Sequence, residues 1–229
     1  MKPIIIGHRG APTLATENTI ESFVMAIKLG ADMIEMDVHE SEDGHLIILH
    51  DDDIARVSSQ QGVVSKMSLS EIKEVTLLGG ERIPTLEEVL ELAKGTVKVD
   101  IEIKVPGVEK KALDLVYHRR MLKDTLFSSF SNEIVQEISY LEPNAETALI
   151  YEQPLEHPIE DALELGASAI NPLFLLLEPG VVEYAHTNGL KVYPWGVNFE
   201  SMIYEMVLMN VDGIITNEIE LCKKVLMST

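Results

Sequence analysis

Short apolar runs alternate with amphipathic segments along most of the 229-residue chain. The apolar runs have the length of buried strands, and the segments between them repeat apolar positions at helical spacing. The predicted strands are Pro3–Gly7, Asp32–Val38, Val97–Ile103, Leu126–Phe130, Glu146–Ile150, Ser168–Ile170, Lys191–Trp195 and Gly213–Thr216. The helices predicted to follow them are Asn18–Leu29, Thr85–Lys94, Glu109–Arg120, Asn132–Leu141, Pro158–Leu165, Pro179–Thr187, Phe199–Met209 and Glu218–Met227.

Eight strand–helix units in series are typical of a parallel (β/α)8 TIM barrel. A doubly wound open sheet is the alternative fold. No GxGxxG motif follows the first predicted strand, which removes the commonest dinucleotide-binding form of that alternative. We therefore predict that residues 1–229 form a single TIM-barrel domain, because a chain of this length can bury one large core.

An additional hairpin is predicted directly after the second strand. Glu35 and Asp37 are alternate residues of this strand and therefore share a face. Asp43-Gly44 is a strong turn dipeptide, and the apolar run Leu46–Leu49 returns to His50. A turn centred on Asp43-Gly44 places Asp37 opposite His50, which predicts two carboxylates beside an imidazole.

Residues 51–84 are the irregular part of the chain. They are rich in turn residues and contain one short predicted helix, Ser70–Val75. This stretch is too long for a simple connection in a compact domain. We predict a small insertion, or lid, at the mouth of the barrel.

Carboxylates gather where the second and third barrel strands end. In a β/α barrel the catalytic groups lie at the C-terminal ends of the strands. Glu35, Asp37 and Glu102 meet this condition, with no thiolate among them. Three carboxylates suit a hard divalent cation, Mg²⁺ or Ca²⁺, whereas Zn²⁺ more often takes His or Cys ligands.

Two histidines and two cationic side chains are predicted to lie beside this metal site. His8 ends the first strand and His50 ends the hairpin, and both suit general acid–base catalysis at a phosphoryl centre. Arg9 and Lys104 would supply donors for the phosphate oxygens.

A set of short motifs then makes the prediction more specific. The motifs are His8-Arg9-Gly10, Glu17-Asn18-Thr19, Glu35-Met36-Asp37-Val38, Asp43-Gly44 before His50-Asp51, Ile83-Pro84-Thr85-Leu86-Glu87-Glu88, Glu102-Ile103-Lys104, Trp195-Gly196-Val197-Asn198 and Asp212-Gly213-Ile214-Ile215-Thr216. In order and spacing the set resembles the glycerophosphodiester phosphodiesterase family of phospholipase C-like TIM barrels. The resemblance covers essentially the whole chain.

The resemblance implies hydrolysis of a glycerophosphodiester to sn-glycerol 3-phosphate and an alcohol. It implies that His8 and His50 are the acid–base pair, and that the three carboxylates hold the metal. Water and the substrate's own 2-hydroxyl are both open as the nucleophile. Trp195, at a strand end, is expected to line the glycerol or leaving-group pocket, with packing at the barrel rim as the alternative.

The chain departs from the family pattern at three places. Thr16 stands where the family has Pro, Gly196 where it has Thr, and Asn217 where it has Asp. None of the three is expected to touch the predicted metal ligands or proton-transfer groups. The departures are therefore expected to affect loop shape and leaving-group preference, and to leave the chemistry unchanged.

Composition narrows the range of partners. The net charge of −20 argues against nucleic acid and anionic membrane surfaces as bulk partners, so a small-molecule substrate is expected. The single cysteine excludes an intrachain disulfide. No signal peptide or stably inserted membrane span is predicted, so we expect a cytoplasmic protein, either monomer or homodimer.

Two other functions stay open at this point. A lysophospholipase D-type phosphodiesterase would act on membrane-derived lysophospholipids through the same site, but no basic amphipathic helix supports it. A non-catalytic metal- or phosphate-binding barrel would be expected to lack one of the predicted catalytic residues, and all of them are present.

Overall fold

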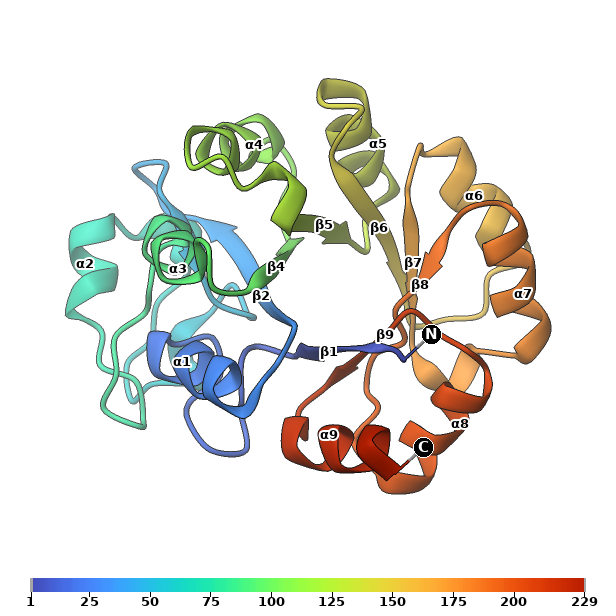
Figure 1. The fold of residues 1–229 in the computed structure, drawn as a ribbon. Helices are drawn as coiled ribbons and strands as arrows, with labels where there is room; N and C mark the ends of the chain where they lie inside the picture. Colours follow the sequence, from blue (N-terminus) through green and yellow to red (C-terminus); the bar gives the residue numbers. More distant parts are fainter. Residues whose placement is uncertain (1, 229) are drawn as a thin grey trace.

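Eight parallel strands form a nearly closed barrel in the computed structural model, which describes residues 2–228 (Figure 1). The barrel strands are β1 (Ile4–Gly7), β2 (Met33–Glu40), β4 (Lys98–Ile103), β5 (Thr125–Ser129), β6 (Glu146–Tyr151), β7 (Ala169–Pro172), β8 (Lys191–Val192) and β9 (Gly213–Thr216). A further short strand, β3 (Leu46–Ile48), pairs antiparallel with β2. The prediction of a (β/α)8 TIM barrel is confirmed.

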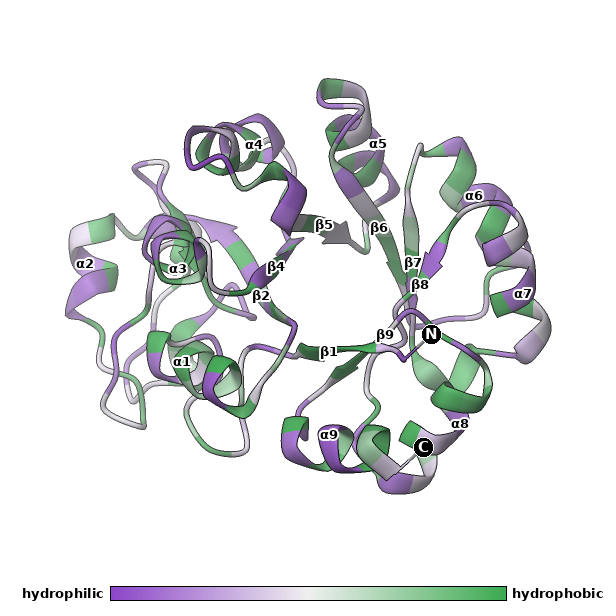
Figure 2. Cartoon of the chain, viewed as in Figure 1, coloured by the Kyte–Doolittle hydropathy of each residue, from purple (hydrophilic) through white to green (hydrophobic). Residues whose placement is uncertain are grey.

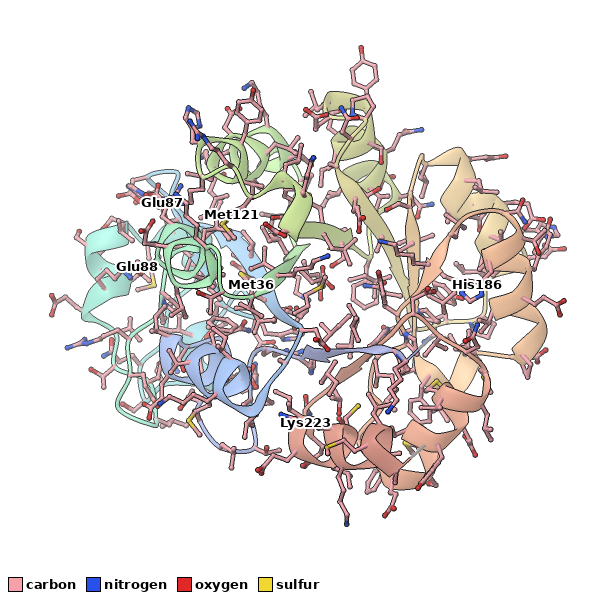
Figure 3. The ribbon with its side chains drawn as sticks, viewed as in Figure 1. Met36, Glu87, Glu88, Met121, His186 and Lys223 are labelled. Carbon is pink, nitrogen blue, oxygen red and sulfur yellow. The ribbon has the colours of Figure 1, made fainter. Side chains whose placement is uncertain are left out.

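A ring of helices surrounds the barrel. They are α1 (Ile20–Leu29), α3 (Leu86–Ala93), α4 (Glu109–His118), α5 (Asn132–Leu141), α6 (Pro158–Glu164), α7 (Pro179–Thr187), α8 (Glu200–Leu208) and α9 (Ile219–Ser228). Apolar residues lie along the strands and on the helix sides that face them (Figure 2). Met36 of β2 points toward α3, while Glu87 and Glu88 lie on the outer side of α3 (Figure 3). The main core is therefore the layer between strands and helices.

The barrel closes between β8 and β9, where the predicted strand is shorter than expected. Only Lys191 and Val192 form a regular strand, because Pro194 has no N–H to donate to a ladder. Closure comes instead from single bridges that join Trp195 to Leu173 and to Ile215. These bridges hold Trp195 at the rim of the barrel.

The hairpin has a different register from the predicted one. Its ladder pairs Glu40 with Leu46, so the loop consists of three residues, Glu42 to Gly44. Gly44 lies in the left-handed region at φ +82°, as a three-residue hairpin loop requires. The predicted pairing of Asp37 with His50 is wrong by one residue, because the Asp37 carbonyl accepts from the Leu49 N–H at 3.0 Å.

Residues 51–84 carry η1 (Ile54–Arg56), η2 (Val64–Lys66) and α2 (Leu69–Glu74). They form a small apolar cluster that Ile47 and Leu49 of the hairpin join. α2 and α3 each begin at a capping box, Ser68 with Glu71 and Thr85 with Glu88. The insertion is thus built around its own core and is anchored to the hairpin that carries His50.

No helix within residues 2–228 is both long enough and apolar enough to cross a lipid bilayer.

Candidate functional site

A cavity of about 430 Å³ opens at the C-terminal ends of the barrel strands. Eight site residues were predicted in all. Six of them form one side of the lining, called here the charged side: His8, Arg9, Glu35, His50, Glu102 and Lys104. Trp195, the predicted pocket residue, also lines it. The cavity has the size of an ordinary small-molecule site.

A buried carboxylate cluster lies at the base of the charged side. Asp37 of β2 and Glu102 of β4 are register partners, and Glu35 lies one layer deeper on β2. One oxygen from each of these three carboxylates lies within 4.8 Å of the others. All three side chains are buried, with relative exposures of 8% or less. The structure therefore brings together the three predicted metal ligands.

The charges in this cluster are unevenly balanced. Burial raises the pKa of Glu102 to about 7, and Asp37 adds repulsion. Burial also raises the pKa of Glu35 well above its usual range, with Asp37 and Glu102 adding to the effect. For Asp37, burial is outweighed by Lys104 and Arg9, which lower its pKa to about 2. A cation between these carboxylates would relieve the repulsion.

Unpaired oxygens in the cluster also fit a hard cation. Glu35 Oε1 is buried and has no hydrogen-bond partner within residues 2–228. Its other oxygen, Oε2, accepts the Arg9 backbone N–H at 2.7 Å. Oxygen-only ligands with unused lone pairs are what Mg²⁺ and Ca²⁺ require. The residues present therefore fit the predicted cofactor class.

Arg9 and Lys104 lie directly against the carboxylates. Arg9 Nε is 3.2 Å and Lys104 Nζ 2.9 Å from oxygens of Asp37, and Lys104 also pairs with Glu102. Arg9 has φ +54°, an uncommon conformation for a residue other than Gly. This conformation directs its N–H to Glu35 and its guanidinium to Asp37 and Glu17.

His8 makes a contact that the sequence analysis did not anticipate. Its Nδ1 lies 2.8 Å from Asn217 Oδ1, so Nδ1 carries the hydrogen and Nε2 keeps its lone pair. Burial, followed by the charge of Arg9, lowers the pKa of His8 to about 4. The expectation that none of the three family departures touches a proton-transfer group is therefore wrong at Asn217. The two residues are 209 positions apart in the sequence, and only the fold brings them into contact.

His50 is held by a carboxylate instead of an amide. Its Nδ1 hydrogen-bonds Asp51 Oδ1 at 2.8 Å, and its carbonyl accepts from His39 Nε2 at 3.1 Å. Burial lowers the pKa of His50, and the carboxylates of Asp37 and Asp51 partly offset this. The two imidazoles of the cavity thus have different partners and different charge environments.

A chain of ion pairs connects the insertion to this side of the cavity. Arg56 of η1 pairs with Asp51, and its Nη2 donates to Glu17 Oε1 at 2.7 Å. Glu17 in turn accepts from Arg9 Nη1 at 3.1 Å. The insertion therefore helps to hold both the partner of His50 and the guanidinium of Arg9.

Asn18 is a functional neighbour of the carboxylate cluster that the sequence did not identify. Asn18 begins the first predicted helix, but Thr19 caps α1 in the structure, and Asn18 Nδ2 donates to Asp37 Oδ2 at 2.7 Å. Asp100 is fully buried and accepts from Ser128 Oγ at 2.6 Å. Asn18 has φ +57°, and its place in the Glu17-Asn18-Thr19 motif is the sequence signal that could have identified it.

The other side of the cavity comes from β5 to β9. Its lining residues are Ser128, Phe130, Ile150, Glu152, Asn171, Trp195 and Ile215. Only Trp195 among them was predicted as a site residue. Ile215 falls in the Asp212-to-Thr216 motif, and Phe130 in a Ser129-Phe130 pair that also resembles the family, but neither was given a role. The rest lie at strand ends without a motif, and strand alternation alone does not separate them from core residues.

Comparisons with known proteins agree with this geometry. The family model described as the glycerophosphoryl diester phosphodiesterase family matches residues 8–221. A glycerophosphodiester phosphodiesterase of Caldanaerobacter subterraneus subsp. tengcongensis is 35% identical over 96% of both chains. The crystal structure of a glycerophosphodiester phosphodiesterase from Agrobacterium tumefaciens is 30% identical, with a TM-score of 0.87 over 97% of this chain and 99% of that one. A Thermotoga maritima glycerophosphodiester phosphodiesterase structure is 27% identical, with a TM-score of 0.84 over 98% and 99% of the two chains. The chain belongs to the glycerophosphoryl diester phosphodiesterase family.

Proposed function

We propose that this chain hydrolyses a glycerophosphodiester to sn-glycerol 3-phosphate and an alcohol, using one divalent cation and two histidines. Membership of the family supports the activity. One observation carries the mechanism: a single cavity is lined by two imidazoles, two cationic side chains and members of a buried carboxylate cluster. This is the set of groups that an anionic phosphodiester needs for binding and for proton transfer.

The cationic side chains bind and orient the phosphate. Arg9 and Lys104 both line the cavity, and each lies within ion-pair distance of Asp37. They attract the nonbridging phosphate oxygens and stabilise the charge that grows on those oxygens during attack.

The two histidines move protons in opposite directions. His8 is neutral, and its Nε2 takes the proton from the attacking hydroxyl of water or of the glycerol 2-position. As the new P–O bond forms, the bond from phosphorus to the alcohol oxygen breaks. Attack by water gives sn-glycerol 3-phosphate directly, whereas attack by the 2-hydroxyl gives a cyclic phosphate, which water then opens by breaking the P–O bond at the 2-position. His50 gives a proton to that departing oxygen, and Asp51 stabilises its imidazolium form.

Glu35, Asp37 and Glu102 would hold the cation, Mg²⁺ or Ca²⁺. A divalent cation bound there supplies positive charge that neutralises phosphate oxygens and lowers the pKa of an adjacent hydroxyl. Asn18 keeps Asp37 in position for this role through its hydrogen bond to Oδ2. The proposal therefore assigns the buried carboxylates to cation binding and the exposed faces of the imidazoles to proton transfer.

Product formation tests the proposal directly. The protein is incubated with glycerophosphoglycerol, glycerophosphocholine or glycerophosphoethanolamine in Mg²⁺ or Ca²⁺, and ³¹P NMR follows the phosphomonoester. We expect sn-glycerol 3-phosphate, its loss in EDTA, and its loss in Glu102→Gln but not in Glu164→Gln, an exposed control on α6. Absence of product from all three diesters would refute the activity, and release from a lysophospholipid alone would replace the substrate class.

A further inference from the structure

The β5–β9 side of the cavity carries a single charged group, Glu152. Both cationic side chains of the cavity, Arg9 and Lys104, lie on the opposite side. Glu152 is exposed and makes no ion pair or hydrogen bond within residues 2–228. A carboxylate that lines a cavity without a partner is available to a positively charged ligand.

Strand register places Glu152 opposite an aromatic wall. Ile150 and Glu152 are alternate residues at the end of β6, and both line the cavity. β6 and β7 pair through Tyr151 and Pro172. Leu173, which directly follows β7, bridges to Trp195. Glu152 and Trp195 therefore lie on either side of Leu173, about two strand spacings or roughly 10 Å apart.

Two aromatic rings form the wall itself. The rings of Phe130 and Trp195 pack edge to face, with centroids 6.2 Å apart and an interplanar angle of 82°. Lys104 Nζ lies 5.7 Å from the Phe130 centroid, so this ring already stands beside one cation. Aromatic faces attract ammonium groups, and they do so most strongly where water is excluded.

Unsatisfied polar atoms lie beneath this wall. Asn171 is 1% exposed and lines the cavity, yet neither its Oδ1 nor its Nδ2 has a hydrogen-bond partner within residues 2–228. Trp195 Nε1 is also buried without a partner in that range. Buried polar groups are nearly always paired, so a polar ligand is the natural partner for these atoms.

We infer that the β5–β9 side of the cavity is a subsite for the leaving alcohol and selects an alcohol that carries an ammonium group. Glu152 and the ring of Trp195 contact the ammonium, while Phe130, which Lys104 Nζ already faces, packs edge to face against Trp195. Asn171 hydrogen-bonds the polar atoms of the alcohol. The assignment rests on the proposed function, because it requires the phosphate to lie between Arg9 and Lys104. An anionic alcohol would face the negative charge of Glu152, while Lys104 lies against the Phe130 ring and pairs with Asp37 and Glu102.

Substrate selectivity of Glu152→Gln tests this inference. The substitution removes the charge and keeps the shape, and exposed Glu152 makes no hydrogen bond or ion pair within residues 2–228 that it would break. We expect kcat/KM to fall about tenfold for glycerophosphocholine and glycerophosphoethanolamine, and to stay within about twofold for glycerophosphoglycerol. Glu164→Gln, at the end of α6, is the matched control and is expected to leave all three values unchanged.

Equal changes for all three diesters, or no change for any, would overturn the inference while leaving the proposed function intact. If the wild-type protein hydrolysed none of them, the proposed function would fail, and a binding measurement would still decide the subsite. Choline, ethanolamine and glycerol are titrated by NMR at constant ionic strength. Binding of the two amino alcohols that is weakened in Glu152→Gln supports the subsite, and equal binding in both proteins rejects it.

Discussion

The two sides of the barrel mouth differ in how their polar groups are paired. On the β1–β4 side, Arg9 and Lys104 both pair with Asp37, and His50 hydrogen-bonds Asp51. On the β5–β9 side, Glu152 and Asn171 line the same cavity without a partner in the part of the chain that the structure describes. Groups that perform chemistry are held in place before a ligand arrives, whereas groups that recognise a ligand wait for it.

This contrast also explains the electrostatics of the cavity. The protein carries a net charge of −20, which opposes the approach of an anionic substrate. Positive side chains are concentrated on the β1–β4 side, where the phosphate is expected, and buried carboxylates beneath them require a cation. The overall negative field then favours the ammonium end of a substrate on the opposite side.

The largest expected effect comes from removing a proton-transfer group. We predict that His50→Ala lowers kcat by about 10² to 10⁴-fold with little change in KM, because general acid catalysis contributes on that order. Glu164→Gln, on α6 and outside the cavity lining, should leave kcat within about twofold. Steady-state kinetics with saturating metal measures both values.

His45→Ala is the matched control for this prediction. His45 belongs to the same hairpin but is exposed and outside the cavity lining, so its loss should leave kcat unchanged. Wild-type turnover by His50→Ala in saturating metal would remove His50 from the mechanism. It would also contradict the proposal that the β1–β4 side is the chemical side of the cavity and the β5–β9 side is the recognition side.

The chemical side was largely predictable from sequence. His8, Glu35, Glu102 and Lys104 fall at strand ends within a series of strand–helix units, and strand alternation alone brings the carboxylates to one face. The hairpin register was predicted one residue out, because a three-residue loop and a two-residue loop share the Asp43-Gly44 signal. β3 ends at Ile48 and Leu49 still donates to the Asp37 carbonyl, so His50 is the first residue beyond this pairing, and it lines the cavity.

The partners of these groups were not predictable in the same way. Asn217 is 209 residues from His8, and only closure of the barrel between β1 and β9 brings the two together. Glu152 and Asn171 belong to no motif, and their function depends on which neighbours they lack. The absence of a partner is a property of the packed structure and leaves no pattern in the chain.

A second prediction concerns the metal-free protein. Burial raises the pKa of Glu102 and that of Asp100 to about 7, compared with about 4 in an unfolded chain. The folded state therefore holds protons that the unfolded chain releases, so the free energy of unfolding falls as pH rises from about 4 to about 7. Metal binding needs ionised carboxylates, so its stabilising effect grows over the same range.

Thermal unfolding measures this difference. The gap in Tm between metal-saturated protein and protein in EDTA should widen by on the order of 5 °C between pH 5 and pH 8. Glu102→Gln should remove most of the widening, and Glu152→Gln, on the recognition side, should preserve it. A gap that is the same at both pH values would argue against a cation site made of these carboxylates.

The smallest expected effect concerns the boundary between the two sides. There Asn217, which follows β9, hydrogen-bonds His8, which follows β1. Asn217→Asp keeps an oxygen acceptor for His8 Nδ1 and adds a negative charge, which raises the pKa of His8 from about 4. A base must be unprotonated to act, so the acid limb of kcat/KM should move to higher pH. We predict a loss of about three- to tenfold at pH 5 and less than about threefold at pH 8. Asn188→Asp, an exposed position after α7, adds the same charge and should leave the profile in place. An unshifted acid limb in Asn217→Asp would mean that His8 is not the base, and that the amide beside it serves packing alone.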